Sequence, residues 1–160
     1  MASTRWLTAP QERAWRRYRR RRTLLDLQIM RDLQRDSGLS DADYDVLSTL
    51  SEKPGSQWRA RDLAAQLLWS TSRLAHHLGR MEQRGLVTRE PSADDARGSL
   101  ISLTEQGRDT LVAAAPQHVA SVRRHLIGLL TAEEVAALDT IAEKVITHLA
   151  GESPADPPPG

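Results

Sequence analysis

An apolar helical stripe, long for so short a chain, is the feature that most constrains the fold. Apolar side chains recur at spacings of three and four from Trp15 to Leu33, which is the repeat of an α-helix. A capping box at residues 8–11 and a terminating glycine at Gly38 bound this pattern. We therefore expect one helix over residues 9–37. Its length exceeds that of most globular helices, which predicts that a partner chain covers part of the stripe.

Composition excludes several protein classes. The 160 residues contain no Cys, so disulfides, Cys–zinc sites and thiol catalysis are excluded. Aromatic residues make up 4% and Phe is absent, which argues against a large β-sandwich. No apolar run approaches the ~20 residues of a membrane span, and the N-terminus lacks the order of a secretion signal. We expect a cytoplasmic protein with no membrane partner.

The basic residues are almost all Arg. The net charge is only +1, but apart from Lys53 and Lys144 every basic residue is Arg. The planar guanidinium suits recognition of phosphates and base edges, although codon usage alone can produce the same bias.

The middle of the chain reads as short helices followed by strands. Ser40, with Asp43 at the N3 position, caps a helix that ends at residues 53–55. Further elements follow from apolar spacing and turn residues. They are an extended piece at 57–59, helices at 61–68 and 70–84, and strands at 86–89 and 99–103 around a polar loop at 91–98.

The C-terminal part returns to the helical repeat. Thr104 caps a helix to about Leu130, in which Pro116 predicts a kink. A capping box at residues 131–134 begins a last helix, whose heptad-like apolar spacing reaches Leu149. We expect four parts: an N-terminal helix at 1–37, a region of short helices and strands at 38–104, C-terminal helices at 105–150 and a disordered, proline-rich tail at 151–160.

Helices 61–68 and 70–84 have the tight connection of a helix-turn-helix, whose second helix enters the DNA major groove. The face opposite Leu74, Leu78 and Met81 is rich in hydroxyl, imidazole and guanidinium groups. An ordinary amphipathic surface helix would explain this face equally well. The candidate DNA-binding residues here are Arg61, Ser70, Thr71, Ser72, Arg73, His76, His77, Arg80 and Arg89.

The pair of strands that follows favours DNA binding, because a helix-turn-helix with a two-stranded ribbon is a winged helix. Arg97, in the polar loop, would reach the minor groove, whose negative potential attracts Arg. Asp95 would aim Arg97 through an ion pair. The alternative is a plain solvated turn.

These segments resemble the MarR family of bacterial transcriptional regulators. The resembling stretches are DLAAQLLWSTSRLAHHLGRMEQRGLVTRE and DDARGSLISLTEQG, between Asp62 and Gly107. The family's Asp-x-Arg matches residues 95–97, and its Leu-Thr-x-x-Gly matches residues 103–107. The resemblance implies a mainly α fold with a small β hairpin, in which a winged helix-turn-helix is joined to N- and C-terminal dimerisation helices. It also implies a homodimer that regulates transcription from double-stranded DNA, with the helix at Ser70 as reader and Arg97 in the minor groove.

The arginine run at residues 16–22 has three interpretations. It wraps most of a helix, so it fits a solvated helix with some Arg paired to acids of a partner subunit. It also fits direct binding of phosphate or RNA. The resemblance implies a third interpretation, a site for a small anionic aromatic effector. The side chains for that site are Trp15, Tyr18, Arg22, Tyr44 and Trp69.

Metal binding and catalysis have little support in the sequence. His76 and His77 point about 100° apart on a helix, and His118 and His125 are two turns apart, so neither pair suits one ion. No phosphate loop or nucleophile elbow accompanies the acids. We expect no metal, cofactor or enzymatic activity. The alternatives to a DNA-binding repressor are a helical protein-interaction module and an RNA-binding adaptor that uses the Arg-rich first helix.

Overall fold

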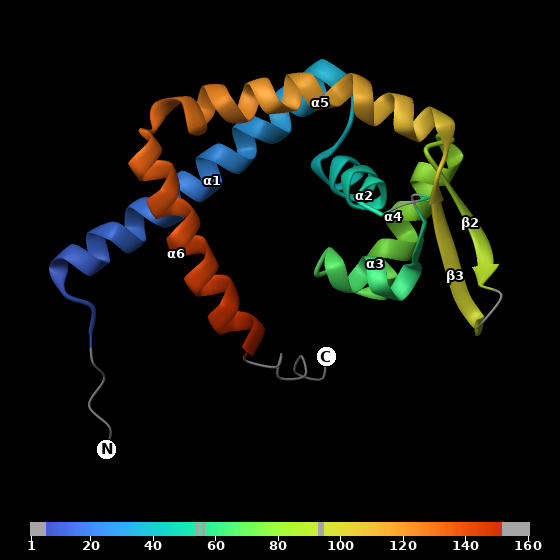
Figure 1. Cartoon of the computed structure of the whole chain (residues 1–160), viewed down its shortest axis with the longest axis horizontal. Helices are drawn as coiled ribbons and strands as arrows, with labels where there is room; N and C mark the ends of the chain where they lie inside the picture. The colour runs from blue at the N-terminus through green and yellow to red at the C-terminus, as the bar shows by residue number, and fades with distance from the viewer. Residues whose placement is uncertain (1–5, 54, 56, 93–94, 152–160) are drawn as a thin grey trace. The chain divides into compact units, whose positions relative to one another are not determined.

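The computed structural model describes residues 6–53, 55, 57–92 and 95–151, with the backbone alone at 95–97 (Figure 1). The chain divides into two compact units, Met1–Ser121 and Val122–Gly160. The elements of the first unit are α1 (Ala9–Ser37), α2 (Asp41–Ser51), β1 (Gln57–Arg59), α3 (Ala60–Gln66), α4 (Thr71–Gln83), β2 (Val87–Ser92), β3 (Asp95–Leu103) and most of α5 (Glu105–His125). The second unit holds the end of α5, a 3₁₀ turn η2 (Ile127–Leu129) and α6 (Ala132–Gly151).

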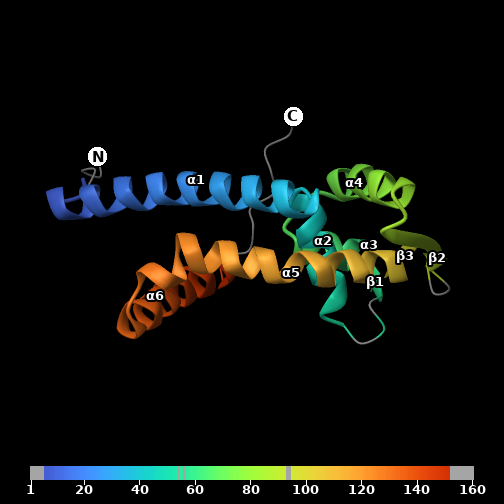
Figure 2. The ribbon, with the colours of Figure 1, turned by 90° about the horizontal axis from the view of Figure 1, so that it is seen from above.

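Helix α1 begins and ends where the sequence predicted. The backbone N–H of Thr8 donates to Gln11 Oε1 over 2.9 Å, which is one arm of the capping box. At the other end Gly38 takes a left-handed φ of 69° and donates its N–H to Gln34 O. Along α1 only Asp32 and Leu33 are buried, and the N-terminal half extends away from α2 (Figure 2). Within one chain, most of the apolar stripe is therefore exposed.

The predicted hairpin is part of a three-stranded antiparallel sheet with the order β1-β3-β2. The extended piece at 57–59 is its third strand, since Trp58 pairs with Ile101. The polar loop predicted at 91–98 is wrong in extent: β2 continues to Ser92 and β3 begins at Asp95. Ladder hydrogen bonds join backbones and do not require apolar side chains. The edge position of β2 also tolerates Pro91.

The turn between α3 and α4 differs slightly from the prediction. Helix α3 covers residues 60–66 in place of 61–68, because Leu68 leaves the helical conformation with a φ of 55°. A left-handed φ favours glycine, yet here the residue is a Leu whose side chain is 92% exposed. The strain of this turn is therefore not compensated by burial of the Leu68 side chain.

The core lies among α2, α3, α4 and the sheet. Leu74, Leu78 and Met81 of α4 are fully buried, as the apolar spacing predicted. Gly107 allows α5 to approach the backbone of Leu86, the residue before β2, because a Cβ at position 107 would lie 2.0 Å from Leu86 O. The buried apolar side chains are Leu33, Leu39, Val46, Leu47, Leu50, Trp58, Leu63, Ala64, Leu74, Leu78, Met81, Leu86, Val87, Ile101 and Ala114.

The C-terminal helices follow the predicted order with one changed boundary. Helix α5 continues through Pro116 but ends at His125, not at Leu130, because Leu126 leaves the helical region and η2 follows. The capping box of α6 is confirmed, since Thr131 N donates to Glu134 Oε2 and Glu134 N donates to Thr131 Oγ1. Of the predicted tail, Gly151 belongs to α6 and residues 152–160 lie outside the described part. None of the described helices is long and apolar enough to cross a membrane.

Candidate nucleic-acid interface

The N-terminal end of α4 is an exposed, polar surface. Ser70 is its N-cap, and its Oγ accepts a hydrogen bond from Arg73 N over 3.2 Å. Thr71, Ser72 and Arg73 in the first turn are all exposed. The first N–H groups of a helix and its dipole favour an anion at this end, so a backbone phosphate can bind here.

Arg73 is held in place by the turn that precedes α4. Its guanidinium carbon lies 4.1 Å from the centre of the Trp69 ring, within the range of a cation–π contact. The other face of the turn packs inward, where the Trp69 ring meets His77 edge-on at 5.6 Å. The bulky Trp69 therefore links the exposed Arg73 to the interior of the domain.

The two adjacent histidines of α4 have different environments. His76 is exposed, as a DNA-contacting residue must be, and its Nε2 lies 3.1 Å from Arg80 Nη1. His77 is only 6% exposed, so its side chain does not lie on the exposed face of α4 with the other predicted DNA-contacting residues. The physical reason is its position three residues after Leu74, on the buried stripe. Arg80 is exposed, as predicted, and also contacts His77 Nδ1 over 2.8 Å.

Asp43 of α2 connects to α4 through buried contacts that the sequence analysis did not find. Its Oδ2 accepts from Arg84 Nη1 over 2.7 Å and from Ser40 N over 3.0 Å. Its Oδ1 lies 3.1 Å from His77 Nε2. Burial raises the pKa of Asp43, but hydrogen bonds from Arg84 and Ser40 outweigh burial and leave it lowered. Helices α2 and α4 are thereby joined by an ionised carboxylate.

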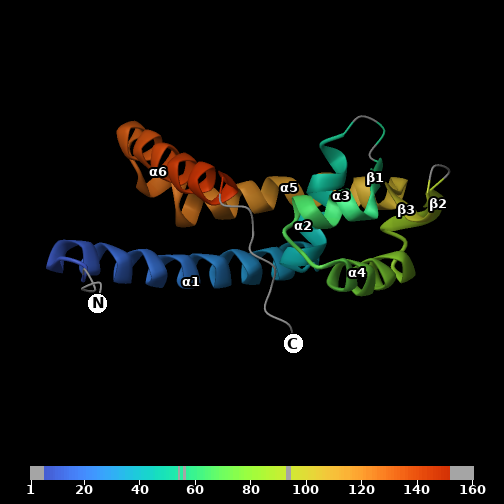
Figure 3. The same ribbon diagram turned by 90° about the horizontal axis from the view of Figure 1, so that it is seen from below.

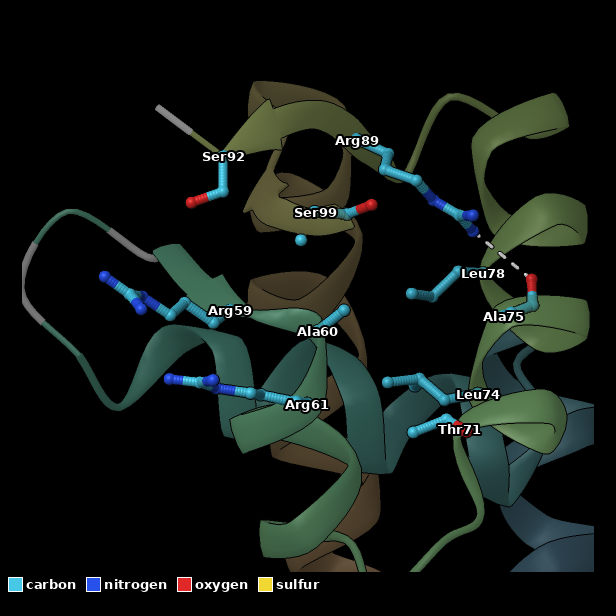
Figure 4. A pocket seen from close by; sticks show the side chains of 11 residues that line it. Arg59, Ala60, Arg61, Thr71, Leu74, Ala75, Leu78, Arg89, Ser92 and Ser99 are labelled. Carbon is cyan, nitrogen blue, oxygen red and sulfur yellow. Dashed lines mark hydrogen bonds between the residues drawn. The ribbon is translucent and has the colours of Figure 1, made fainter. Parts of the chain in front are cut away.

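A pocket of about 260 Å³ lies between the helix-turn-helix and the strands of the wing (Figure 4). Helix α4 and β2 lie side by side in both turned views (Figures 2 and 3). Leu74 and Leu78 project into the pocket from α4, while Arg59, Arg61 and Arg89 supply positive charge around it.

The arginines around this pocket differ in how firmly they are held. Arg89 Nη2 donates to Ala75 O over 3.2 Å and lies 3.5 Å from Glu82 Oε2, so it joins the wing to α4. Arg61 is exposed, with its Nε 3.4 Å from Asp62. Arg59 was not among the predicted residues. Its position could have indicated it, because Arg59 is the last residue of β1 and the N-cap of α3.

The two residues predicted at the tip of the wing are placed only by their backbone. Asp95 and Arg97 lie in β3, and Asp95 pairs with Ser92 across the hairpin. Their side chains lie outside the described part of the chain. The ion pair and the minor-groove contact therefore stay predictions.

One chain does not bring the five predicted effector residues together. Trp15 stacks on Tyr18 with ring centres 5.8 Å apart near the N-terminal end of α1. Tyr44 instead packs against His118 at 4.3 Å. From Trp15 to the end of α1 the helix rises roughly 33 Å, which separates Trp15, Tyr18 and Arg22 from Tyr44 and Trp69. One chain alone therefore does not form this site, and the effector site stays a prediction.

Metal-ligating side chains do not gather in the described residues. No group of three or more His, Asp and Glu side chains there is placed to hold an ion.

Comparison with known sequences assigns a family to the central segment. The model of the MarR family matches residues 37–98. The transcriptional regulator HosA of Escherichia coli is 37% identical over 108 residues, which cover 68% of this chain and 78% of HosA.

Comparison with solved structures extends the similarity over nearly the whole chain. AbsC, a MarR family transcriptional regulator from Streptomyces coelicolor, superposes with a TM-score of 0.87 at 44% identity, covering 92% of this chain and 99% of AbsC. Sco3205, a regulator of the same family and organism solved in complex with DNA, gives a TM-score of 0.88 at 37% identity and 93% coverage of both chains.

Proposed function

This chain belongs to the MarR family of transcriptional regulators, and we propose that it acts as a homodimeric repressor on a pseudo-palindromic site in double-stranded DNA. Members of this family are regulators and not enzymes. The observation that carries the proposal is the exposed first turn of α4, which lies beside the wing in a fold shared with a DNA-bound relative.

Affinity and sequence preference would come from different side chains. Ser70, Thr71 and Ser72 at the start of α4 would bind backbone phosphates, which fix orientation without reading sequence. Arg73 and Arg80 would donate to guanine O6 and N7 in the major groove, with His76 beside them. Arg97 would enter the minor groove. Because phosphate contacts release counterions, affinity should fall steeply as salt rises.

A second copy of the chain would cover the exposed apolar side chains of the long helices. No residue of α6 is buried within one chain. Interfaces of obligate dimers bury more than ~2,000 Å², which long helices can supply. Two reading helices would then lie about one DNA turn, ~34 Å, apart. The exposed apolar side chains on these helices are Trp15, Leu24, Leu27, Met30, Val112, Val119, Ile141, Val145, Ile146 and Leu149.

We propose further that a small aromatic anion relieves DNA binding by changing the spacing of the two reading helices. Because Trp15, Tyr18 and Arg22 are remote from Tyr44 and Trp69 in one chain, the second copy would have to complete this site. Calorimetric titration of the dimer with aromatic carboxylates tests it. Binding heat together with weakened DNA affinity supports the site, and the absence of both removes it.

Selection from a random duplex library tests the proposed function. We expect an enriched inverted repeat. A helical interaction module would enrich no sequence, and an RNA adaptor would prefer single strands or hairpins when these are offered.

Arg97→Ala should lower affinity for the enriched duplex by ~1–3 kcal/mol and relax preference in the flanking base pairs. An Arg97→Ala variant that binds like the parent would show that the wing assignment is wrong.

A further inference from the structure

The guanidinium of Arg80 is held from two sides by the imidazoles of its own helix. Arg80 Nη1 lies 3.1 Å from His76 Nε2, and Arg80 Nη2 lies 2.8 Å from His77 Nδ1. His76 is exposed and turns toward solvent, whereas His77 is buried. Of the two contacts, the one to His77 thus comes from a side chain that packing keeps in place.

The hydrogen-bonding capacity of the two groups fixes the proton on His77. A guanidinium can only donate, so Nδ1 must present its lone pair to Arg80. The ring proton is then on Nε2, which lies 3.1 Å from Asp43 Oδ1, at ion-pair distance without the alignment of a hydrogen bond. Arg80, His77 and Asp43 thus form a series of polar contacts that runs from the surface of α4 into the interior.

Charged and aromatic neighbours on three elements keep the His77 ring from turning. Asp43 on α2 is itself fixed by Arg84 and by the backbone N–H of Ser40. Trp69, in the turn before α4, meets the ring edge-on. A ring with one carboxylate on one side and one arginine on the other has a single favourable orientation.

We propose that His77 is a positioning residue for DNA recognition: its buried ring accepts from Arg80 and so sets where the guanidinium is presented to the base edges. The proposal rests on the proposed function, in which Arg80 reads a base. An arginine that is oriented before DNA arrives loses less conformational entropy on binding. Arg80 would then discriminate between bases because the buried ring of His77 holds its guanidinium in one place.

The support depends on His77 being neutral. Asp43, Arg80 and Arg84 are the charged groups that face the ring, and His76 faces Arg80 from the other side. Burial lowers the pKa of His77, Asp43 raises it, and Arg80 and Arg84 lower it, with a net decrease from 6.5. The lone pair on Nδ1 is therefore available to Arg80 at neutral pH.

Long-range ¹H–¹⁵N spectra of the full-length protein test the contact without DNA. We expect His77 to be the Nε2–H tautomer, and we expect Arg80→Ala to shift the Nδ1 resonance and to raise the pKa of His77. A Nδ1–H tautomer, or a Nδ1 resonance and pKa that Arg80→Ala leaves unchanged, would overturn the proposal. Because the parent protein supplies the tautomer, that part of the test does not depend on the folding of any variant.

A matched pair of substitutions tests the role in recognition. Asn places its amide near the position of Nδ1 and can accept from Arg80, whereas Gln places its amide near Nε2 and reaches toward Asp43. On the duplex that the parent enriches, we expect His77→Gln to lose about tenfold of the discrimination at one base pair of each half-site, while His77→Asn stays within about twofold of the parent.

The outcomes of this pair separate positioning from packing. Equal losses in both variants, or no loss in His77→Gln, would contradict the proposal, because a purely structural histidine would treat the two amides alike. A parent that enriches no duplex removes the proposed function and the DNA role of His77 together, while the spectra still report whether the Arg80 contact exists.

Discussion

At the scale of single residues, Asp43 shows how this small domain keeps a charge in its interior. The carboxylate is buried, yet Arg84, His77 and the N-cap Ser40 all contact it. Its partners come from α4 and from the residue before α2. The same side chain therefore completes a helix cap and ties two helices together.

Replacing Asp43 by Asn should destabilise the protein. The amide keeps the shape of the side chain but removes the charge that Arg84 binds over 2.7 Å. We expect a loss of about 1–3 kcal/mol in the free energy of unfolding, measured by urea denaturation. Asp41→Asn is the control, because Asp41 is exposed in the same helix turn and should change stability by less than about 0.5 kcal/mol. Equal losses for the two variants would contradict the role of Asp43.

Stability should fall with decreasing pH in two steps. His77 has a lowered pKa, so just below pH 6.5 the unfolded chain binds more protons than the folded one and the free energy of unfolding decreases. Asp43 also has a lowered pKa, so its contribution is lost as pH falls below 3.8. Urea denaturation between pH 8 and pH 5 should show a smaller slope for His77→Asn than for the parent. Parallel slopes would contradict the assignment to His77.

Leu68 offers a stabilising substitution in the turn before α4. Its φ of 55° is unfavourable for a side chain with Cβ, and the side chain is 92% exposed, so Gly removes strain and loses little burial. We expect Leu68→Gly to raise the free energy of unfolding by about 1 kcal/mol in thermal denaturation. Leu67→Gly, at a neighbouring residue with φ −80° and a half-buried side chain, should be destabilising. A Leu68→Gly variant less stable than the parent would show that the backbone conformation of Leu68 does not destabilise the protein.

The buried stripe of α4 was predictable from the sequence, but the buried histidine was not. Leu74, Leu78 and Met81 follow the helical repeat, so their burial was predictable. His77 lies three residues after Leu74 and shares that stripe, but a polar side chain is usually expected on an exposed face. Its partner Asp43 is on another helix, and such pairs depend on tertiary packing that spacing along the chain does not encode.

At the scale of elements, the wing is longer than its composition suggested. Alternation of apolar and polar residues marks only the part of each strand that covers the core. Beyond that part, β2 and β3 stay paired through their backbones up to Ser92 and Asp95. Strand existence was therefore predictable and strand length was not.

The N-terminal half of α1 should be ordered by a second copy. Residues 9–20 are exposed throughout in one chain, and isolated helices of such length are marginal in water. We expect their backbone amides to exchange hydrogen rapidly in a dilute monomer and slowly at concentrations where the dimer forms. Exchange measured by mass spectrometry at several concentrations checks this. Slow exchange in a protein shown to be monomeric would contradict it.

At the scale of the whole molecule, the exposed side of α6 is the place to test assembly. Val145 lies on the predicted heptad and is 52% exposed in one chain. Val145→Glu should yield a monomer at micromolar concentration in sedimentation velocity and should weaken binding to the enriched duplex. Thr140→Glu, an exposed position of the same helix that lies about 140° around the axis, is the control of equal charge. Dimers of equal stability in both variants would exclude α6 from the interface.

The family resemblance and the long apolar stripes gave the architecture in advance. Apolar spacing reveals that a surface is covered but carries no information about which surface covers it. For that reason the helices of the second unit were predictable from the sequence. The positions of the effector residues relative to one another were not. Trp15 and Tyr44 are each adjacent to an aromatic neighbour, but the two pairs are different.

The order β1-β3-β2 has a mechanical consequence. Since β1 pairs with the central strand and leads directly into α3, the base of the wing is fastened to the helix-turn-helix at both ends. Arg89 adds a further fastening to α4. If the helix-turn-helix and the wing face DNA as proposed, these contacts would fix the distance between them. A duplex that twists or narrows to match that distance would then bind at a lower elastic energy than a stiffer duplex with the same contacted bases.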